Sequence, residues 1–250
     1  IPKDVTGAIT EYVPEPPVQV EPVTSYDQAA VLHAAQLINS ASRPLIYFGG
    51  GVCASGAGEL LRELTQKAQI PATYTLMAAG VMGYGDPLNL GLLGMHGSYT
   101  TNKAASQADV LIAIGTRFSD RVALDPASFA KNAVRIQFDI DASEIGKNVD
   151  VDCSVVGGAA VVLKALLPHI QPATHPEWMR QLQSWQSIDY RPKDHSDRLM
   201  PHQVIGSCCE LAGPDAVYVT DVGQHQMWAC QYIRHVKDRK FLTSGGLGTM

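Results

Sequence analysis

The sequence has few charged residues and no basic excess. Its 250 residues include 19 Lys and Arg against 24 Asp and Glu, which gives a formal net charge of -5 and a pI near 5.9. Binding of a nucleic-acid backbone requires a concentrated positive surface, so we expect no nucleic-acid partner. The sequence also lacks a run of about 18 apolar residues, so we expect no membrane span. It has no basic segment followed by an apolar one, so we expect no signal peptide.

Cysteine is scarce as well, and its spacing carries no metal signature. The five cysteines are odd in number and include no CxxC pair. We interpret them as reduced, packing thiols of an intracellular protein, and we predict no metal site within the chain. The expected compartment is the cytoplasm, or a plastid or mitochondrion in a eukaryote. The cysteines are Cys53, Cys153, Cys208, Cys209 and Cys230.

From residue 26 onward, helix-like periods alternate with short and almost continuous apolar runs. Such alternation is typical of a parallel sheet covered on both faces. We therefore predict an α/β fold with a doubly wound parallel sheet over residues 26–172. The expected helices cover 27–41, 58–68, 99–107 and the end of 154–170, and the expected strands cover 44–51, 70–76, 108–118, 133–141 and the start of 154–170.

The flanking segments differ in composition from this domain. Residues 11–25 hold four prolines and no periodicity, so residues 1–25 are interpreted as a linker from a missing upstream domain. Residues 173–199 combine a helix-like stretch with a polar one and are interpreted as a second linker. Residues 200–250 are predicted to be the truncated start of a second α/β domain, because the chain ends just after a glycine-rich strand exit.

One anion site is predicted in this second domain. The apolar segment 216–222 predicts a buried strand, and Gly223 then leads into a helix that opens with Gln224 and His225. Free backbone N–H groups and the positive end of the helix dipole favour a phosphate at such a helix start. A histidine there is also common as a surface or capping group.

A second candidate site lies at the ends of the predicted central strands. Three segments each lie at the end of a predicted strand: Gly49–Gly51, Gly115–Phe118 and Asp139–Asp141. In a doubly wound sheet these ends line one crevice, where glycines, an arginine and a carboxylate suit a nucleotide. The glycines also suit a tight turn without a ligand, because they lack GxGxxG spacing. For Asp141, capping of the next helix is favoured over ligand contact.

Several strings resemble motifs of one enzyme family. The strings TDVGQHQMWA and TSGGLGTM resemble the start of the thiamine-diphosphate domain of the acetolactate synthase (acetohydroxyacid synthase) family. The strings IPKDV, PLIYFGGGV, GLLGMHG, GTRFSDR and FDIDASEIGKN resemble successive motifs of its catalytic subunit, in the same order. The resemblance therefore spans essentially the whole chain.

The resemblance implies an activity and three cofactors. Members decarboxylate pyruvate on thiamine diphosphate and transfer the hydroxyethyl unit to pyruvate or 2-oxobutyrate, a step of branched-chain amino-acid biosynthesis. Mg²⁺ holds the diphosphate, and FAD is structural because no net redox change occurs. The implied enzyme is a homodimer or homotetramer that acts on 2-oxoacids, with a regulatory subunit left open. The catalytic glutamate and the GDG…N metal motif are absent from this chain, so we expect it to be inactive alone.

The resemblance also assigns site residues. Arg121 is expected to hold the carboxylate of the second 2-oxoacid, because a guanidinium grips a carboxylate with two hydrogen bonds. Lys3, Met95, Asp120 and Arg121 would line the channel to the thiamine carbon, Gln224 and His225 would bind the diphosphate, and Met250 would support the bent cofactor. The implied FAD contacts are Gly49, Gly50, Thr75, Leu76, Leu93, Gly94, Met95, His96, Gly115, Thr116, Arg117, Phe118, Asp139 and Ile140.

Two positions depart from the family pattern. Ser119 replaces a carboxylate beside the channel pair, and Gly157-Gly158 replaces Gly-Asp near the end of the domain. The first change leaves the channel pair Asp120 and Arg121 intact, whereas the second removes an adenine-side contact, so we expect weaker FAD binding. Two alternatives remain: another FAD-containing thiamine-diphosphate carboligase such as glyoxylate carboligase, and a non-catalytic flavin- or ADP-binding module.

Overall fold

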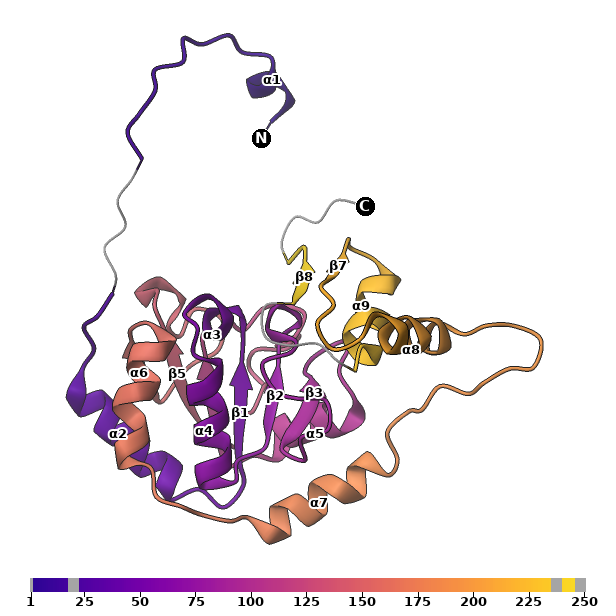
Figure 1. Cartoon of the computed structure of the whole chain (residues 1–250). Coiled ribbons are helices and arrows are strands. Elements are labelled where there is room, and N and C mark those ends of the chain that lie inside the picture. The colour runs from indigo at the N-terminus through magenta and orange to yellow at the C-terminus, as the bar shows by residue number, and fades with distance from the viewer. Residues whose placement is uncertain (1, 18–22, 235–239, 246–250) are drawn as a thin grey trace.

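The computed structural model describes residues 2–17, 23–234 and 240–245, and its centre is a six-stranded parallel sheet (Figure 1). The strand order is β3-β2-β1-β4-β5-β6, so β1 and β4 are neighbours where the order reverses. This order confirms the predicted doubly wound sheet, and the reversal marks where such sheets bind ligands. The strands are β1 (Pro44–Phe48), β2 (Ala72–Tyr74), β3 (Asn89–Leu92), β4 (Val110–Ile114), β5 (Val134–Asp139) and β6 (Cys153–Val156).

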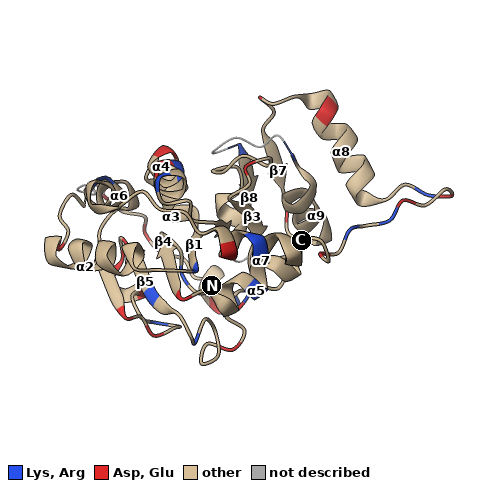
Figure 2. Ribbon diagram, turned by 90° about the horizontal axis from the view of Figure 1, so that it is seen from below, with Lys and Arg blue, Asp and Glu red and all other residues tan. Residues whose placement is uncertain are grey.

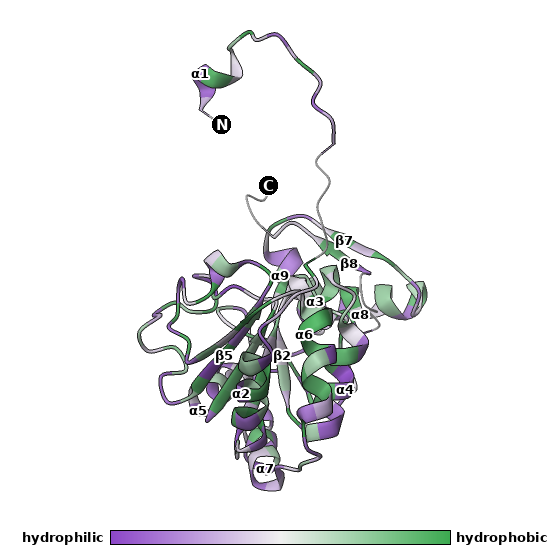
Figure 3. Cartoon of the chain, turned by 90° about the vertical axis from the view of Figure 1, so that its left-hand side faces the viewer, coloured by the Kyte–Doolittle hydropathy of each residue, from purple (hydrophilic) through white to green (hydrophobic). Residues whose placement is uncertain are grey.

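Helices cover both faces of the sheet, and the core is divided accordingly. Ile46 and Phe48 of β1 pack with α2 (Gln28–Asn39), α4 (Gly58–Ala68) and α6 (Ala159–Leu166). Leu45 and Tyr47 point to the other face, toward α5 (Tyr99–Gln107) and α7 (Pro176–Gln186). In Figure 3, α6 is largely green, in keeping with its apolar sequence AAVVLKAL. Because both faces are covered, β1 and β4 are buried along their whole length.

Side-chain hydrogen bonds fix the ends of several elements. Asp27 caps α2, where its carboxylate accepts from the backbone N–H groups of Ala29 and Ala30. Trp178 fastens α7 to the sheet: it is buried, and its indole N–H donates to the Pro44 carbonyl over 3.0 Å. The Trp178 contact holds α7 at the amino end of β1, opposite the end from which the glycine run 49–51 follows.

The chain also forms a smaller unit after α7. It contains α8 (Pro201–Ala212), α9 (Gln224–Tyr232) and a two-stranded parallel sheet of β7 (Tyr218–Thr220) and β8 (Phe241–Thr243). Cys230 and Phe241 of this unit pack against Tyr74 of β2 and Leu92 of β3. The predicted burial of the strand in 216–222 was wrong, since Val219 is 74% exposed. Among the described residues β7 pairs only with β8, which leaves this side chain uncovered.

The structure adds short elements that the sequence pattern did not predict. α3 (Gly50–Ala54) begins inside the glycine run, and β3 lies within residues 77–98, for which no helix or strand was predicted. Three 3-10 turns are η1 (Leu76–Ala78), η2 (Ala142–Glu144) and η3 (Leu167–His169), and a short helix α1 (Lys3–Thr6) lies near the N-terminus. No helix among the described residues is long and apolar enough to cross a membrane. Figure 2 shows acidic and basic residues interspersed over helices and loops.

Candidate functional site

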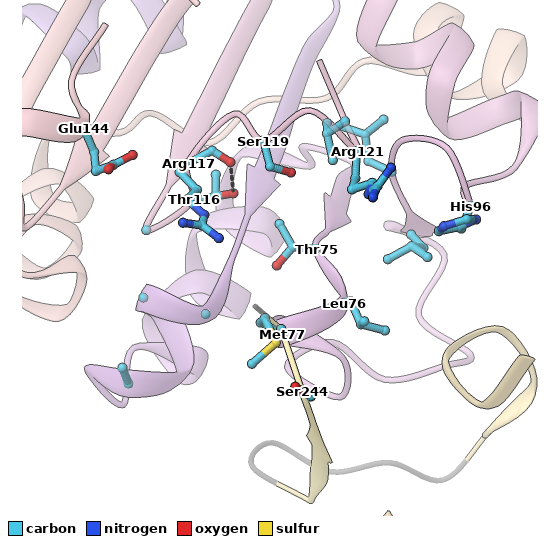
Figure 4. Close-up of a pocket in the computed structure, with 18 of the residues that line it drawn as sticks. Thr75, Leu76, Met77, His96, Thr116, Arg117, Ser119, Arg121, Glu144 and Ser244 are labelled. Carbon is cyan, nitrogen blue, oxygen red and sulfur yellow. Dashed lines mark hydrogen bonds between the residues drawn. The ribbon is translucent and has the colours of Figure 1, made fainter. Parts of the chain in front are cut away.

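A large cleft runs along the carboxyl ends of the central strands and continues to the start of α9. Its volume is about 1130 Å³, at the upper end of what ligand pockets occupy. Figure 4 shows Arg117 and Thr116 on one side, Met77 and Ser244 opposite, and Arg121 with His96 at one end. The cleft therefore joins the large domain to the smaller unit, and its length suits an extended ligand.

Glycines bring the backbone of β1 and β4 into contact at the middle of the cleft. The Gly51 N–H donates to the Gly115 carbonyl over 2.9 Å, and a Cβ on Gly51 would lie 2.7 Å from the Gly115 Cα. Gly49 is equally crowded by Gly115 and Thr116. Both Gly49 and Gly51 are therefore needed for the close packing of the two turns. Gly50 and Gly51 both line the cleft, but Gly50 differs because a Cβ there would meet only Met77, whose side chain lies at 3.2 Å.

Carboxylates lie at the β5 end of the cleft. Asp139 lines it, and burial raises the pKa of this carboxyl, with the nearby charge of Glu144 acting in the same direction. Asp141 caps η2 by accepting from the Ser143 N–H over 2.8 Å, which confirms the capping role favoured from the sequence. Hydrogen bonds from Ser143 lower the pKa of Asp141. Buried Gln137 donates to the Glu144 carbonyl and steadies this loop.

The turn after β3 and the loop after β4 form the Arg121 end. The Met95 N–H donates to the Arg121 carbonyl over 2.8 Å, and Gly94 has φ +102°. A Cβ on Gly94 would lie 2.5 Å from the Arg121 carbonyl oxygen, so only glycine fits this crossing. Burial lowers the pKa of His96, and the charge of Arg121 lowers it further. The His96 imidazole and the Arg121 guanidinium thus share this end of the cleft.

The start of α9 closes the other side. Gly223, with φ +147°, precedes the nine-residue helix, and Gln224 lines the cleft. Buried Gln226 donates to the Thr243 hydroxyl over 2.6 Å and to the Ser244 carbonyl over 2.9 Å. Gln226 thereby ties α9 to the segment that follows β8.

Most of the residues predicted from the sequence meet in this cleft, but several do not line it. Those that line it are Gly50, Thr75, Leu76, Leu93, Met95, His96, Gly115, Thr116, Arg117, Arg121, Asp139, Ile140 and Gln224. Gly49, Gly94 and Phe118 are buried beside it, whereas Asp120 and His225 are exposed and do not line it. Lys3 lies in α1, away from the cleft (Figure 1), and Met250 lies outside the described residues.

The sequence analysis missed other lining residues. Met77 comes from a 3-10 turn, Glu144 from the capped turn after β5, and Gln226 and Met227 from α9. Glu144 lies within the string FDIDASEIGKN, and Gln226 and Met227 lie within TDVGQHQMWA, whereas Met77 lies in none of the recognised strings. Over the part of the chain that the structure describes, no group of three or more His, Cys, Asp or Glu side chains is arranged to hold a metal.

Comparison with known proteins agrees with this architecture. Residues 31–166 match the family model "thiamine pyrophosphate enzyme, central domain", and residues 221–250 match "thiamine pyrophosphate enzyme, C-terminal TPP binding domain". All of the chain aligns with acetolactate synthase of Mycobacterium bovis at 41% identity, and with the large subunits of Corynebacterium glutamicum at 40% and of Escherichia coli K12 isozyme 1 at 38%. The chain spans 42%, 42% and 44% of these relatives. The first match covers more than half of the chain, and the chain therefore belongs to the thiamine pyrophosphate enzyme family.

Proposed function

We propose that the protein carrying this chain is an acetolactate synthase. It would decarboxylate pyruvate and join the two-carbon unit to pyruvate or 2-oxobutyrate. The observation that carries the proposal is the single cleft that joins the start of α9 to Arg121 and to the strand ends. The names of the relatives, at about 40% identity over the whole chain, support the same activity.

FAD is the proposed ligand of the strand ends. The glycine turn at the β1–β4 reversal gives a ligand access to the backbone, and Gly50 faces the cleft there. Arg117 lies in the cleft near this turn and offers a charged partner to a diphosphate (Figure 4). Asp139, further along, is placed to accept from ribose hydroxyls. These groups fit an extended dinucleotide whose role is structural.

Thiamine diphosphate is the proposed ligand of the α9 start. Gly223 and Gln224 present a helix N-terminus to the cleft, and His225 is adjacent, which suits a diphosphate. When bound at this helix start, thiamine diphosphate would supply a nucleophilic ring carbon for chemistry at a 2-oxoacid carbonyl. As the sequence resemblance implies, Met250 would support the bent cofactor. The activating glutamate and the Mg²⁺ ligands would come from parts of the enzyme other than residues 1–250.

Arg121 is the proposed anchor of the acceptor 2-oxoacid. Its guanidinium lies at the end of the cleft beside His96, whose pKa is lowered by burial and by the charge of Arg121. Arg121 therefore supplies the positive charge that a substrate carboxylate needs there. Met95, Asp120 and Lys3 are proposed to border the same channel in the assembled enzyme.

The proposed organisation follows from these sites. Residues 1–25 and 173–199 would be linkers, residues 26–172 the FAD-binding domain, and residues 200–250 the beginning of the thiamine-diphosphate domain. We propose a homodimer or homotetramer, and a regulatory subunit by analogy with relatives named as large subunits.

Gly50→Val should weaken flavin binding by about tenfold or more without unfolding the protein, because the branched side chain would enter the cleft beside Met77. Flavin titration by fluorescence measures the loss, and circular dichroism checks the fold. Gly206→Val is the matched control, since a Cβ there meets nothing within 4 Å. Equal flavin affinity in the Gly50 variant and the control would exclude FAD from this turn.

A further inference from the structure

The turn that carries Met95 and His96 is held by a side-chain amide from α5. Asn102 accepts from the Gly94 N–H over 3.1 Å and donates to the Gly94 carbonyl over 3.0 Å. The same Nδ2 group donates to the Ser98 carbonyl over 3.1 Å. One amide therefore engages both polar groups of Gly94 and fixes the orientation of its two adjoining peptide planes.

The Gly94 turn, which Asn102 holds, is in direct contact with the Arg121 backbone. Gly94 lies so close to the Arg121 carbonyl that no side chain fits between them, and the Met95 N–H donates to the same oxygen. Close packing of two backbone segments leaves little freedom for one to move without the other. The position of the Gly94 turn therefore sets where the Arg121 backbone lies at the end of the cleft.

A second side-chain amide reaches the turn from the smaller unit. Gln231 of α9 donates from Nε2 to the His96 carbonyl over 2.9 Å. The N-terminus of the same helix faces the cleft through Gln224. α9 thus borders the cleft with its first turn and holds the Met95–His96 turn with its last.

We propose that Asn102 and Gln231 are positioning residues that hold the Met95–His96 turn, and through it Arg121, in register with α9. Neither residue lines the cleft. The inference rests on the proposed function for the reaction that is measured, because Arg121 is taken as the anchor of the acceptor 2-oxoacid. Loss of either amide donor should shift the turn and weaken acceptor binding while leaving the first decarboxylation largely intact.

The test uses the complete polypeptide that carries residues 1–250, with Asn102→Asp, Gln231→Glu and the double variant. Each substitution keeps the side-chain size and removes the donor. Gln183→Glu is the control, because Gln183 is an exposed glutamine of α7.

Hydrogen exchange of the Met95 amide should become about tenfold faster in both single variants, since its bond to Arg121 opens more often. The KM for 2-oxobutyrate as acceptor should rise roughly two- to tenfold, with a smaller change in pyruvate decarboxylation.

The double variant tests whether the two amides act on the same turn. If both amides act through one turn, its KM effect should be smaller than the product of the two single effects. Unchanged Met95 exchange in folded variants would overturn the inference, whatever the enzyme does. Faster exchange with an unaltered acceptor KM would also overturn it. If the unsubstituted protein makes no acetolactate while exchange responds as expected, the proposed function fails and the positioning of the turn stands.

Discussion

Arg121→Ala is expected to slow the acceptor step roughly ten- to a hundredfold, because it removes a charge-assisted contact worth about 1.5 to 3 kcal/mol. The first decarboxylation should suffer less, so the variant should release more acetaldehyde per acetolactate formed. Product analysis at several 2-oxobutyrate concentrations measures both effects in the complete polypeptide.

Arg121→Lys separates charge from geometry. Lysine keeps the positive charge and loses the planar fork, so it should restore only part of the acceptor step. The alternative role for Arg121 is an exposed ion pair with a surface carboxylate. Such a pair would contribute at most about 1 kcal/mol to stability. Among the described residues no carboxylate lies within 4.0 Å of the Arg121 guanidinium, which argues against that role. An unaltered product ratio in Arg121→Ala would remove Arg121 from the site.

Gly51→Ala should lower the free energy of unfolding by about 3 kcal/mol, near the upper end for overpacking. The added methyl would lie 2.7 Å from the Gly115 Cα and 3.0 Å from its carbonyl oxygen, so two backbone segments must separate at the centre of the sheet. Urea denaturation followed by circular dichroism measures the change.

Gly50→Ala is the matched control for this substitution. The same methyl at the neighbouring position meets the movable Met77 side chain at 3.2 Å and no backbone closer than 4.0 Å. It should cost much less stability than Gly51→Ala. Equal losses in the two variants would mean that the contact between the glycine turns does not limit the packing at the strand reversal.

The regular helices of the fold could be predicted from local signals. The expected helices at 58–68 and 99–107 have the same bounds in the structure, because α4 has an apolar stripe and Ser98 caps the start of α5. β3 was missed because it is four residues long and contains Gly91 with φ +98°. α3 was missed because glycine favours a turn in the sequence pattern, while here the first turn of a helix starts within the glycine run.

The candidate site could be predicted in part from the topology of the parallel sheet. Parallel strands place their carboxyl ends along one edge, so Arg117 and Asp139 could be expected in one crevice. The contribution of Met77 could not, because it comes from a short 3-10 turn that lies outside every predicted element. The backbone contact between Gly94 and Arg121 joins two loops distant in sequence, and no local pattern encodes it.

The central claim is that this cleft belongs to an enzyme that joins two 2-oxoacids. The most direct measurement supplies the complete polypeptide with thiamine diphosphate, Mg²⁺ and FAD, offers pyruvate, 2-oxobutyrate and glyoxylate in separate and mixed reactions, and identifies the products. We predict acetolactate from pyruvate alone and the mixed acetohydroxy acid when 2-oxobutyrate is added. Condensation of glyoxylate with no product from pyruvate, or flavin binding without any carbon–carbon bond formation, would contradict the account.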